Sequence, residues 1–105
     1  MELDVFLKRM VDERASDIFV VAGLPLTYAV GGRHVRLDET GPMTPSSTEQ
    51  FVRSIYAASG RDFEHFVAGF NHDEDFSFAL PGIGRFRANV FRPRGSFSMV
   101  IRVIP

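Results

Sequence analysis

The chain has 105 residues, 45% of them apolar, and a net charge of −1. This length holds one hydrophobic core and excludes a second domain, and an apolar content that includes eleven phenylalanines excludes intrinsic disorder. The absence of cysteine excludes a disulfide framework and any thiolate nucleophile or metal ligand, and it is typical of a reducing compartment such as the cytoplasm. No apolar run approaches the roughly 20 residues that span a bilayer, and the acidic start at Glu2 and Asp4 is unlike a signal peptide.

The first predicted elements are a helix and a short strand. Over residues 3–14 the apolar side chains recur at the i, i+3, i+4, i+7 and i+8 spacing of an amphipathic helix, from Leu3 to Val11. Ala15-Ser16-Asp17 ends that period. The β-branched and aromatic run 18–21 then predicts a buried strand.

A hairpin and a polar connection follow. Residues 26–30 and 34–37 flank Gly31-Gly32, and paired glycines tolerate the positive φ angles of a tight hairpin turn. We therefore expect a second and a third strand there. Residues 38–45 are polar and contain glycine and proline, which predicts an irregular connection.

Two helices are predicted in the middle of the chain. Thr44 is a candidate N-cap, Pro45 suits the first helical position, and Gly60 is a plausible C-terminal stop. A second, shorter helix is indicated by Phe63, Phe66, Val67 and Phe70.

The last third changes to a period of two, which predicts three strands at 76–80, 85–91 and 97–104, with a turn at 81–84. One helix, three strands, two helices and three strands make an α+β domain. We expect a largely antiparallel sheet of about six strands, covered on one side by about three helices.

The charges are distributed unevenly along the chain. All thirteen acidic residues lie within residues 1–75, which carry a net charge of −6, whereas residues 76–105 carry +5. The five basic residues of this last part are Arg85, Arg87, Arg92, Arg94 and Arg102. Such asymmetry usually means that the basic part meets an anion.

Strand alternation predicts which arginines lie together. Along residues 85–91 the set Phe86, Ala88 and Val90 points to the core, so Arg85 and Arg87 point away from it. If the neighbouring strands share that core face, the turn at 81–84 needs an odd-length loop or a bulge, and the loop around Pro93-Arg94 needs an even length. Arg102 then joins Arg85 and Arg87, and Asp75 shares a face with Arg87.

This arginine cluster has two interpretations. It is either the solvated polar face of a half-exposed antiparallel sheet or an anion site. Arginine suits an anion site because its planar fork can hold two phosphate oxygens at once.

Several other functions find little support. A phosphate-binding loop of the G-x-x-x-x-G-K-[ST] type needs a lysine after its glycines, and the only lysine is Lys8 in the first helix. His34, His65 and His72 lack the spacing of a metal site, so we expect no metal. No G-x-S-x-G motif is present, and no catalytic nucleophile is assigned.

The acidic run at 72–75 could bind a cation, but its side chains alternate, which favours a solvated segment or an arginine partner. Single-stranded nucleic acid is a third interpretation, because Phe91 shares the arginine face. The net negative charge opposes it, and we expect no nucleic-acid partner.

Five segments carry a resemblance to a known family. They are Ala15-Ser16-Asp17, Gly31-Gly32, Asp75-Phe76-Ser77-Phe78, Gly84-Arg85-Phe86-Arg87-Ala88-Asn89-Val90-Phe91 and Ile101-Arg102-Val103-Ile104-Pro105. In order and spacing they resemble the N-terminal domain of the PilT-type hexameric ATPases of type IV pilus machines, which serve twitching motility and are related to secretion ATPases. The resemblance covers residues 1–105 and implies a PAS-like domain that precedes a RecA-like ATPase domain. Ile18-Phe19 stands where the family commonly has Leu-His, which affects no predicted site.

The resemblance also implies roles for particular arginines. In that family, arginines on the last strands of this domain reach the phosphates of ATP held by the RecA-like domain. Carried over by motif, this indicates Arg87 and Arg102, and less directly Arg85 and Arg94. Such arginines neutralise charge that develops on the transferred phosphoryl group.

The resemblance further implies a parent ATPase that uses ATP and Mg²⁺, whereas residues 1–105 lack the phosphate-binding loop and the catalytic glutamate. We therefore expect an excised domain with no activity and no cofactor of its own. The implied partners are the RecA-like domain of the same or a neighbouring subunit, a homo-hexamer, and the inner-membrane platform of the pilus machine at the cytoplasmic side. The alternative is a stand-alone PAS-like sensor or interaction module that binds a small anion or a partner.

Overall fold

The structure is a computed structural model that describes residues 2–69 and 73–105. Within them it contains three α-helices, six strands and two short 3-10 turns. In chain order these are α1 (Leu3–Asp12), β1 (Asp17–Val20), β2 (Thr27–Val30), β3 (Arg33–Arg36), η1 (Asp38–Thr40), α2 (Pro45–Ala58), α3 (Phe63–Ala68), β4 (Glu74–Leu80), β5 (Gly84–Phe91), η2 (Pro93–Gly95) and β6 (Ser98–Ile104). The α+β class and the order of the elements are as predicted. Phe70 and His72, which entered the sequence predictions, lie outside the described residues.

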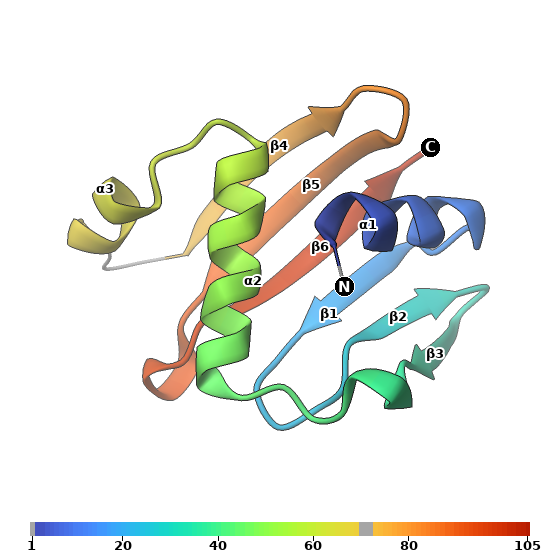
Figure 1. Cartoon of the computed structure of the whole chain (residues 1–105), viewed down its shortest axis with the longest axis horizontal. Helices are drawn as coiled ribbons and strands as arrows, with labels where there is room; N and C mark the ends of the chain where they lie inside the picture. Colours follow the sequence, from blue (N-terminus) through green and yellow to red (C-terminus); the bar gives the residue numbers. More distant parts are fainter. Residues whose placement is uncertain (1, 70–72) are drawn as a thin grey trace.

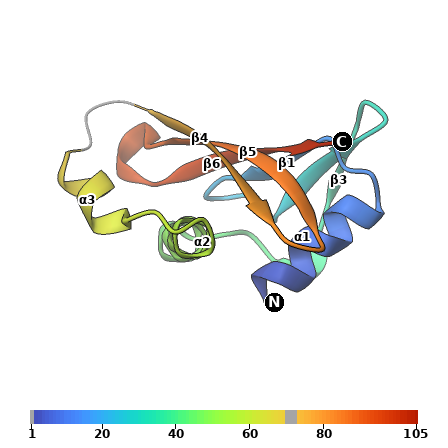
Figure 2. The same cartoon turned by 90° about the horizontal axis from the view of Figure 1, so that it is seen from above.

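The strands form one sheet in the order β3-β2-β1-β6-β5-β4, and every neighbouring pair is antiparallel. The first and the last strand therefore meet at the centre, where Ile18 pairs with Ile101. All three helices lie on the same side of this sheet (Figures 1 and 2), so within the described residues its other side carries no α-helix.

The ends of the helices follow from local chemistry. Thr44 and Ser47 form a reciprocal capping box at the start of α2, as the Thr44-Pro45 pair predicts in part. Gly60 has a φ of +70° just after α2, where a left-handed residue closes the helix. Helix α1 ends two residues earlier than predicted, because Arg14 takes a φ of +59° and its N–H and that of Ala15 bond back to carbonyls of the last turn.

Turn lengths set the register of the strands. Gly31 and Gly32, with φ of +56° and +79°, form the two-residue turn between β2 and β3. The three-residue turn between Leu80 and Gly84 is odd, and the loop of six residues between β5 and β6 is even, as the shared core face requires. The predicted register is therefore confirmed.

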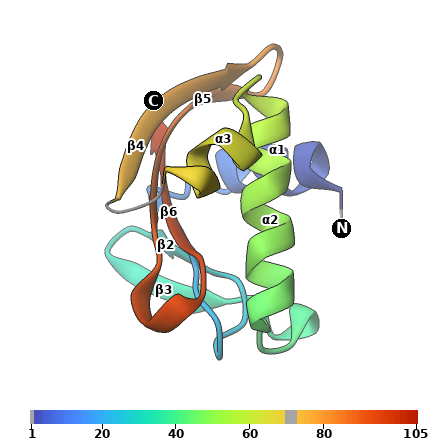
Figure 3. The same cartoon turned by 90° about the vertical axis from the view of Figure 1, so that its left-hand side faces the viewer.

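Figure 3 shows the helices packed on one side of the sheet, and the buried core residues come from both layers. Alternate residues of every central strand point into the core, and Ile18, Phe86, Ala88, Met99 and Ile101 are fully buried. Burying one such large side chain contributes about 1.5–3 kcal/mol. The remaining, alternate residues of each strand therefore point to the helix-free face, which carries the candidate site.

Candidate functional site

Three arginines lie on the helix-free face of the sheet, as predicted. Arg87 of β5 is directly opposite Arg102 of β6, and Arg85 lies two positions from Arg87 along the same strand. Phe86 and Ile101, the chain neighbours of these arginines, are buried in the core. Because strand side chains alternate, the arginines point to the opposite, helix-free face. Like charges directly opposite one another destabilise a sheet. This pair therefore needs compensation from nearby anions.

Two aspartates supply that compensation, one on each side of the pair. Asp75 of β4 accepts from Arg87 Nη2 at 2.9 Å and from Nε at 3.2 Å. Asp17 of β1, which pairs with Arg102 in the sheet, accepts from Arg102 Nε at 3.5 Å. Across the four strands the charges therefore run negative, positive, positive, negative.

The two arginines are held to different degrees. Arg87 makes two bonds to Asp75, and these bonds lower the pKa of the Asp75 carboxyl below its usual value. Arg102 makes a single long contact, and its side chain is 72% exposed against 62% for Arg87. Exposed ion pairs of this kind contribute only about 0–1 kcal/mol. Both guanidinium groups can therefore exchange a carboxylate for another anion at small cost.

A shallow hollow of about 180 Å³ lies between these side chains. Asp17, Asp75, Arg87, Asn89, Val100 and Arg102 line it. Two guanidinium forks and one amide meet there, a set of donors that suits the oxygens of a phosphoryl group. The hollow is open to solvent on the helix-free side, so an anion carried by another domain could approach it.

Arg94 lies apart from the cluster. It belongs to η2, beyond the end of β5, where its φ is +53°. About 13 Å of strand separates Arg87 from the end of β5 at Phe91, at roughly 3.3 Å per residue. Of the four predicted residues, the structure brings Arg85, Arg87 and Arg102 together and leaves Arg94 outside.

Asp17 is a member of the site that the sequence interpretation missed. It directly precedes the buried Ile18, so alternation alone puts its side chain on the opposite face. Its closeness to Arg102 depends on the pairing of β1 with β6, which joins residues 85 positions apart. No local pattern in the sequence indicates that pairing.

Comparison with known proteins identifies the domain type. No protein-family model matches the chain. It is 35% identical over 105 residues to the type IV pilus ATPase PilU of Pseudomonas aeruginosa, and 33% identical over 106 residues to the type IV pilus retraction ATPase PilT of the same organism. A crystal structure of the pilus retraction motor PilT with bound ADP superposes on the whole chain with a TM-score of 0.77 and 32% identity.

The chain is similar over its whole length to one part of these pilus ATPases, consistent with their N-terminal domain. It spans 26% of the length of PilU and 29% of that of PilT. The DotB ATPase of Legionella pneumophila has the same fold, with a TM-score of 0.65 at 24% identity over 97% of the chain and 29% of DotB.

The acidic run before β4 has arginine partners. Asp75 binds Arg87, and Glu74 forms an ion pair with Arg61 Nη2 at 3.3 Å and accepts a hydrogen bond from the hydroxyl of Tyr56. The interpretation that these acids meet arginine is therefore confirmed for Glu74 and Asp75. Among residues 2–69 and 73–105, no three His, Asp or Glu side chains are grouped to hold a metal ion.

None of the described helices is both long and apolar enough to cross a lipid bilayer.

Proposed function

We propose that this chain is the N-terminal domain of a type IV pilus ATPase, and that Arg87 and Arg102 contact the phosphates of ATP bound to a RecA-like domain of the same or a neighbouring subunit. The observation that carries the proposal is the sheet register, which sets these two arginines directly opposite each other on the helix-free face. A phosphoryl group between them would neutralise both charges at once.

The differing restraint of the two arginines suggests how they act. Arg102 needs little rearrangement to reach a phosphate, because one long contact to Asp17 holds it. Arg87 exchanges its two bonds to Asp75 for bonds to phosphate oxygens. Arg85, on the same face, adds positive charge to the approach of the nucleotide.

The whole protein, in this proposal, is a homo-hexameric motor. ATP and Mg²⁺ are held by its RecA-like domain, and the ring docks on the inner-membrane platform of the pilus machine from the cytoplasm. The similarity of the chain to PilU and PilT over its full length supports this assignment. Both relatives are ATPases by name, which supports nucleotide hydrolysis by the parent protein.

The test is ATP hydrolysis by the full-length protein. Arg87→Ala and Arg102→Ala should each lower kcat by about a thousandfold or more, the range measured for arginines that stabilise phosphoryl transfer. Arg36→Ala is the matched control, because Arg36 is an exposed arginine on the edge strand β3, and it should hydrolyse ATP at the parental rate. Unchanged turnover in both Arg87→Ala and Arg102→Ala would refute the proposal.

Folding must be followed separately. Both arginines are exposed, so neither substitution should lower the stability of the 105-residue chain by more than about 1 kcal/mol. Urea unfolding of the two variants distinguishes a lost phosphate contact from a misfolded domain.

The alternative of a stand-alone sensor finds less support. Such a module would hold its ligand in a cavity between sheet and helices. Buried aromatic side chains fill that region instead, including Phe63, Phe66, Phe76, Phe86 and Phe97. Titration of the chain alone with ATP and phosphate tests this alternative, and submicromolar binding would favour it.

A further inference from the structure

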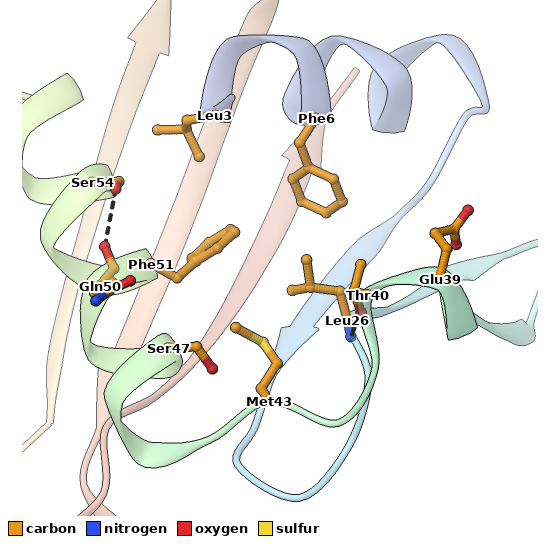
Figure 4. Close-up of a pocket in the computed structure, with 10 residues that line it drawn as sticks. All are labelled: Leu3, Phe6, Leu26, Glu39, Thr40, Met43, Ser47, Gln50, Phe51 and Ser54. Atoms are coloured by element: carbon orange, nitrogen blue, oxygen red, sulfur yellow. Dashed lines mark hydrogen bonds between the residues drawn. The ribbon is translucent and has the colours of Figure 1, made fainter. Parts of the chain in front are cut away.

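A second surface feature lies on the helix-covered side, away from the arginines. It is a groove of about 530 Å³ between α1, α2 and the connection that precedes α2. Figure 4 shows the side chains of Leu3, Phe6, Leu26, Met43 and Phe51 turned toward one shared hollow. Its volume is within the roughly 300–1,000 Å³ of clefts that bind ligands.

The floor of the groove is rigid and its walls are adaptable. Phe6 and Leu26 are buried in the core, and the ring of Phe6 packs edge to face with that of Phe51 at 5.9 Å. Leu3, Met43 and Phe51 are only partly buried. Methionine adapts to partners of different shape because its side chain is unbranched and polarisable.

The hydroxyl groups that line the groove are already engaged within the chain. Ser47 Oγ takes part in the capping box with Thr44. Thr40 Oγ1 donates to the carbonyl of Leu37, and Ser54 Oγ donates to the carbonyl of Gln50. Of the other polar side chains that line the groove, only Glu39 and Gln50 offer a charged or amide group, so recognition there rests mainly on apolar contact.

One carboxylate, that of Glu39, lines the groove, and further acidic residues are next to its lining residues in the chain. The side chain of Glu39 is 60% exposed, and its cation partner Arg9 is 3.9 Å away and also binds Glu13 at 2.8 Å. Asp38 is the neighbour of Glu39, and the exposed Glu2 and Asp4 flank Leu3 in the chain. The charge around the groove therefore favours a basic occupant.

The walls also indicate which kind of segment fits. Two helices and a loop bound the groove, so no free strand edge offers hydrogen bonds to an extended peptide. The backbone of an extended peptide would lose its hydrogen bonds to water there without replacement. A helix satisfies its own backbone and presents apolar side chains along one face.

We propose that this groove binds a basic amphipathic helix of a partner protein. Its apolar face inserts between α1 and α2, against Leu3, Met43 and Phe51, and its lysines or arginines lie beside the carboxylate of Glu39. This site is independent of the arginine cluster, since it lies on the other side of the sheet.

The test uses the 105-residue chain and a defined probe. The probe is a fluorescent, N-acetylated peptide of two copies of Leu-Lys-Lys-Leu-Leu-Lys-Leu, an amphipathic basic helix. Its affinity is measured by fluorescence anisotropy, and its place by amide and methyl NMR shifts. A matched peptide with glutamate in place of every lysine should bind at least about tenfold more weakly, because Glu39 and the neighbouring acidic residues repel it.

Variants of the groove give the expected pattern. The double variant Leu3→Ser/Met43→Ser should weaken the probe about tenfold, and Glu39→Lys about threefold. Glu64→Lys is the control, because it is the same charge reversal at a 73% exposed site on α3, and it should change the affinity by less than about twofold. If the double variant loses its folded NMR spectrum, the exposed Glu39→Lys still tests the charge contact at that position.

Four results would overturn the proposal. The first is probe binding that Glu39→Lys and the double variant leave unchanged, and the second is NMR shifts on the arginine face instead of the groove. The third is self-association of the chain that the double variant abolishes, which would make a second copy the occupant. The fourth is binding of anilinonaphthalenesulfonate in the groove without binding of the peptide, which would indicate a small apolar ligand.

Discussion

The substitution Tyr56→Phe removes one buried oxygen and no packing. Tyr56 lies on α2 with 1% of its surface exposed, and its ring contacts Phe63, Phe66 and Phe76. Its hydroxyl donates to Glu74 at the start of β4 at 2.5 Å. Burial and this hydrogen bond raise the pKa of Tyr56, so the phenol stays a neutral donor at ordinary pH. Phenylalanine keeps the ring contacts and loses only the bond.

The stability lost in Tyr56→Phe depends on how well the carboxylate of Glu74 is satisfied without the tyrosine hydroxyl. A hydrogen bond to a charged group contributes about 1.5–3 kcal/mol. Glu74 keeps Arg61 at 3.3 Å and its side chain is 28% exposed, so water and Arg61 satisfy the carboxylate after the change. We therefore expect a loss near the lower limit, about 1.5 kcal/mol in the free energy of unfolding. For a domain of this size that lowers Tm by about 6–12 °C.

The assay is urea unfolding of Tyr56→Phe, Glu74→Gln and the double variant. The thermodynamic cycle isolates the interaction between the two side chains, which should be about 1 kcal/mol or more. A loss below about 0.5 kcal/mol for Tyr56→Phe, or single-variant effects that simply add, would refute the view that this bond fastens β4 to α2.

Two further predictions concern stability: the effect of removing the N-cap Thr44, and the pH dependence of the ion pair between Asp75 and Arg87. Thr44→Ala should cost about 1 kcal/mol in urea unfolding, because Thr44 Oγ1 accepts from the backbone N–H of Ser47 at 3.1 Å; an unchanged midpoint would show that the cap contributes nothing. The ion pair between Asp75 and Arg87 should stabilise the folded chain at pH values above the unfolded-state pKa of aspartate, about 3.9. Because Arg87 lowers the pKa of Asp75 in the folded state, this contribution is lost as pH falls through the folded-state pKa. Wild type and Asp75→Asn should therefore converge in stability between about pH 5 and pH 2, and a constant difference over that window would contradict the pairing.

Much of the helix-free face could be predicted because strand alternation and loop parity are local. The burial of Phe86, Ala88 and Val90 follows from their spacing, and the opposite orientation of Arg85 and Arg87 follows with it. The lengths of the two connecting turns then determine the pairing of Arg87 with Arg102.

The rest depends on contacts that spacing does not reveal. The position of Asp17 beside Arg102 requires the order of the strands, which is decided by how the whole core packs. The early end of α1 requires Arg14 to enter the left-handed region, and arginine has no intrinsic preference for it. The groove beside Phe51 is equally non-local, because it forms where three separate segments meet.

The position of β6 between β1 and β5 determines when the chain can fold. Among the described strands, β6 alone joins the β3-β2-β1 half of the sheet to the β5-β4 half. Until residues 98–104 have left the ribosome, the two halves cannot pair with each other, and their apolar faces are not yet covered by a complete core. Closing the pair Asp17–Arg102 spans 85 positions, which gives the fold many non-local contacts and favours slow folding. Synthesis of this domain therefore passes through a stage in which nearly all of the sequence is present and the sheet is still in two parts.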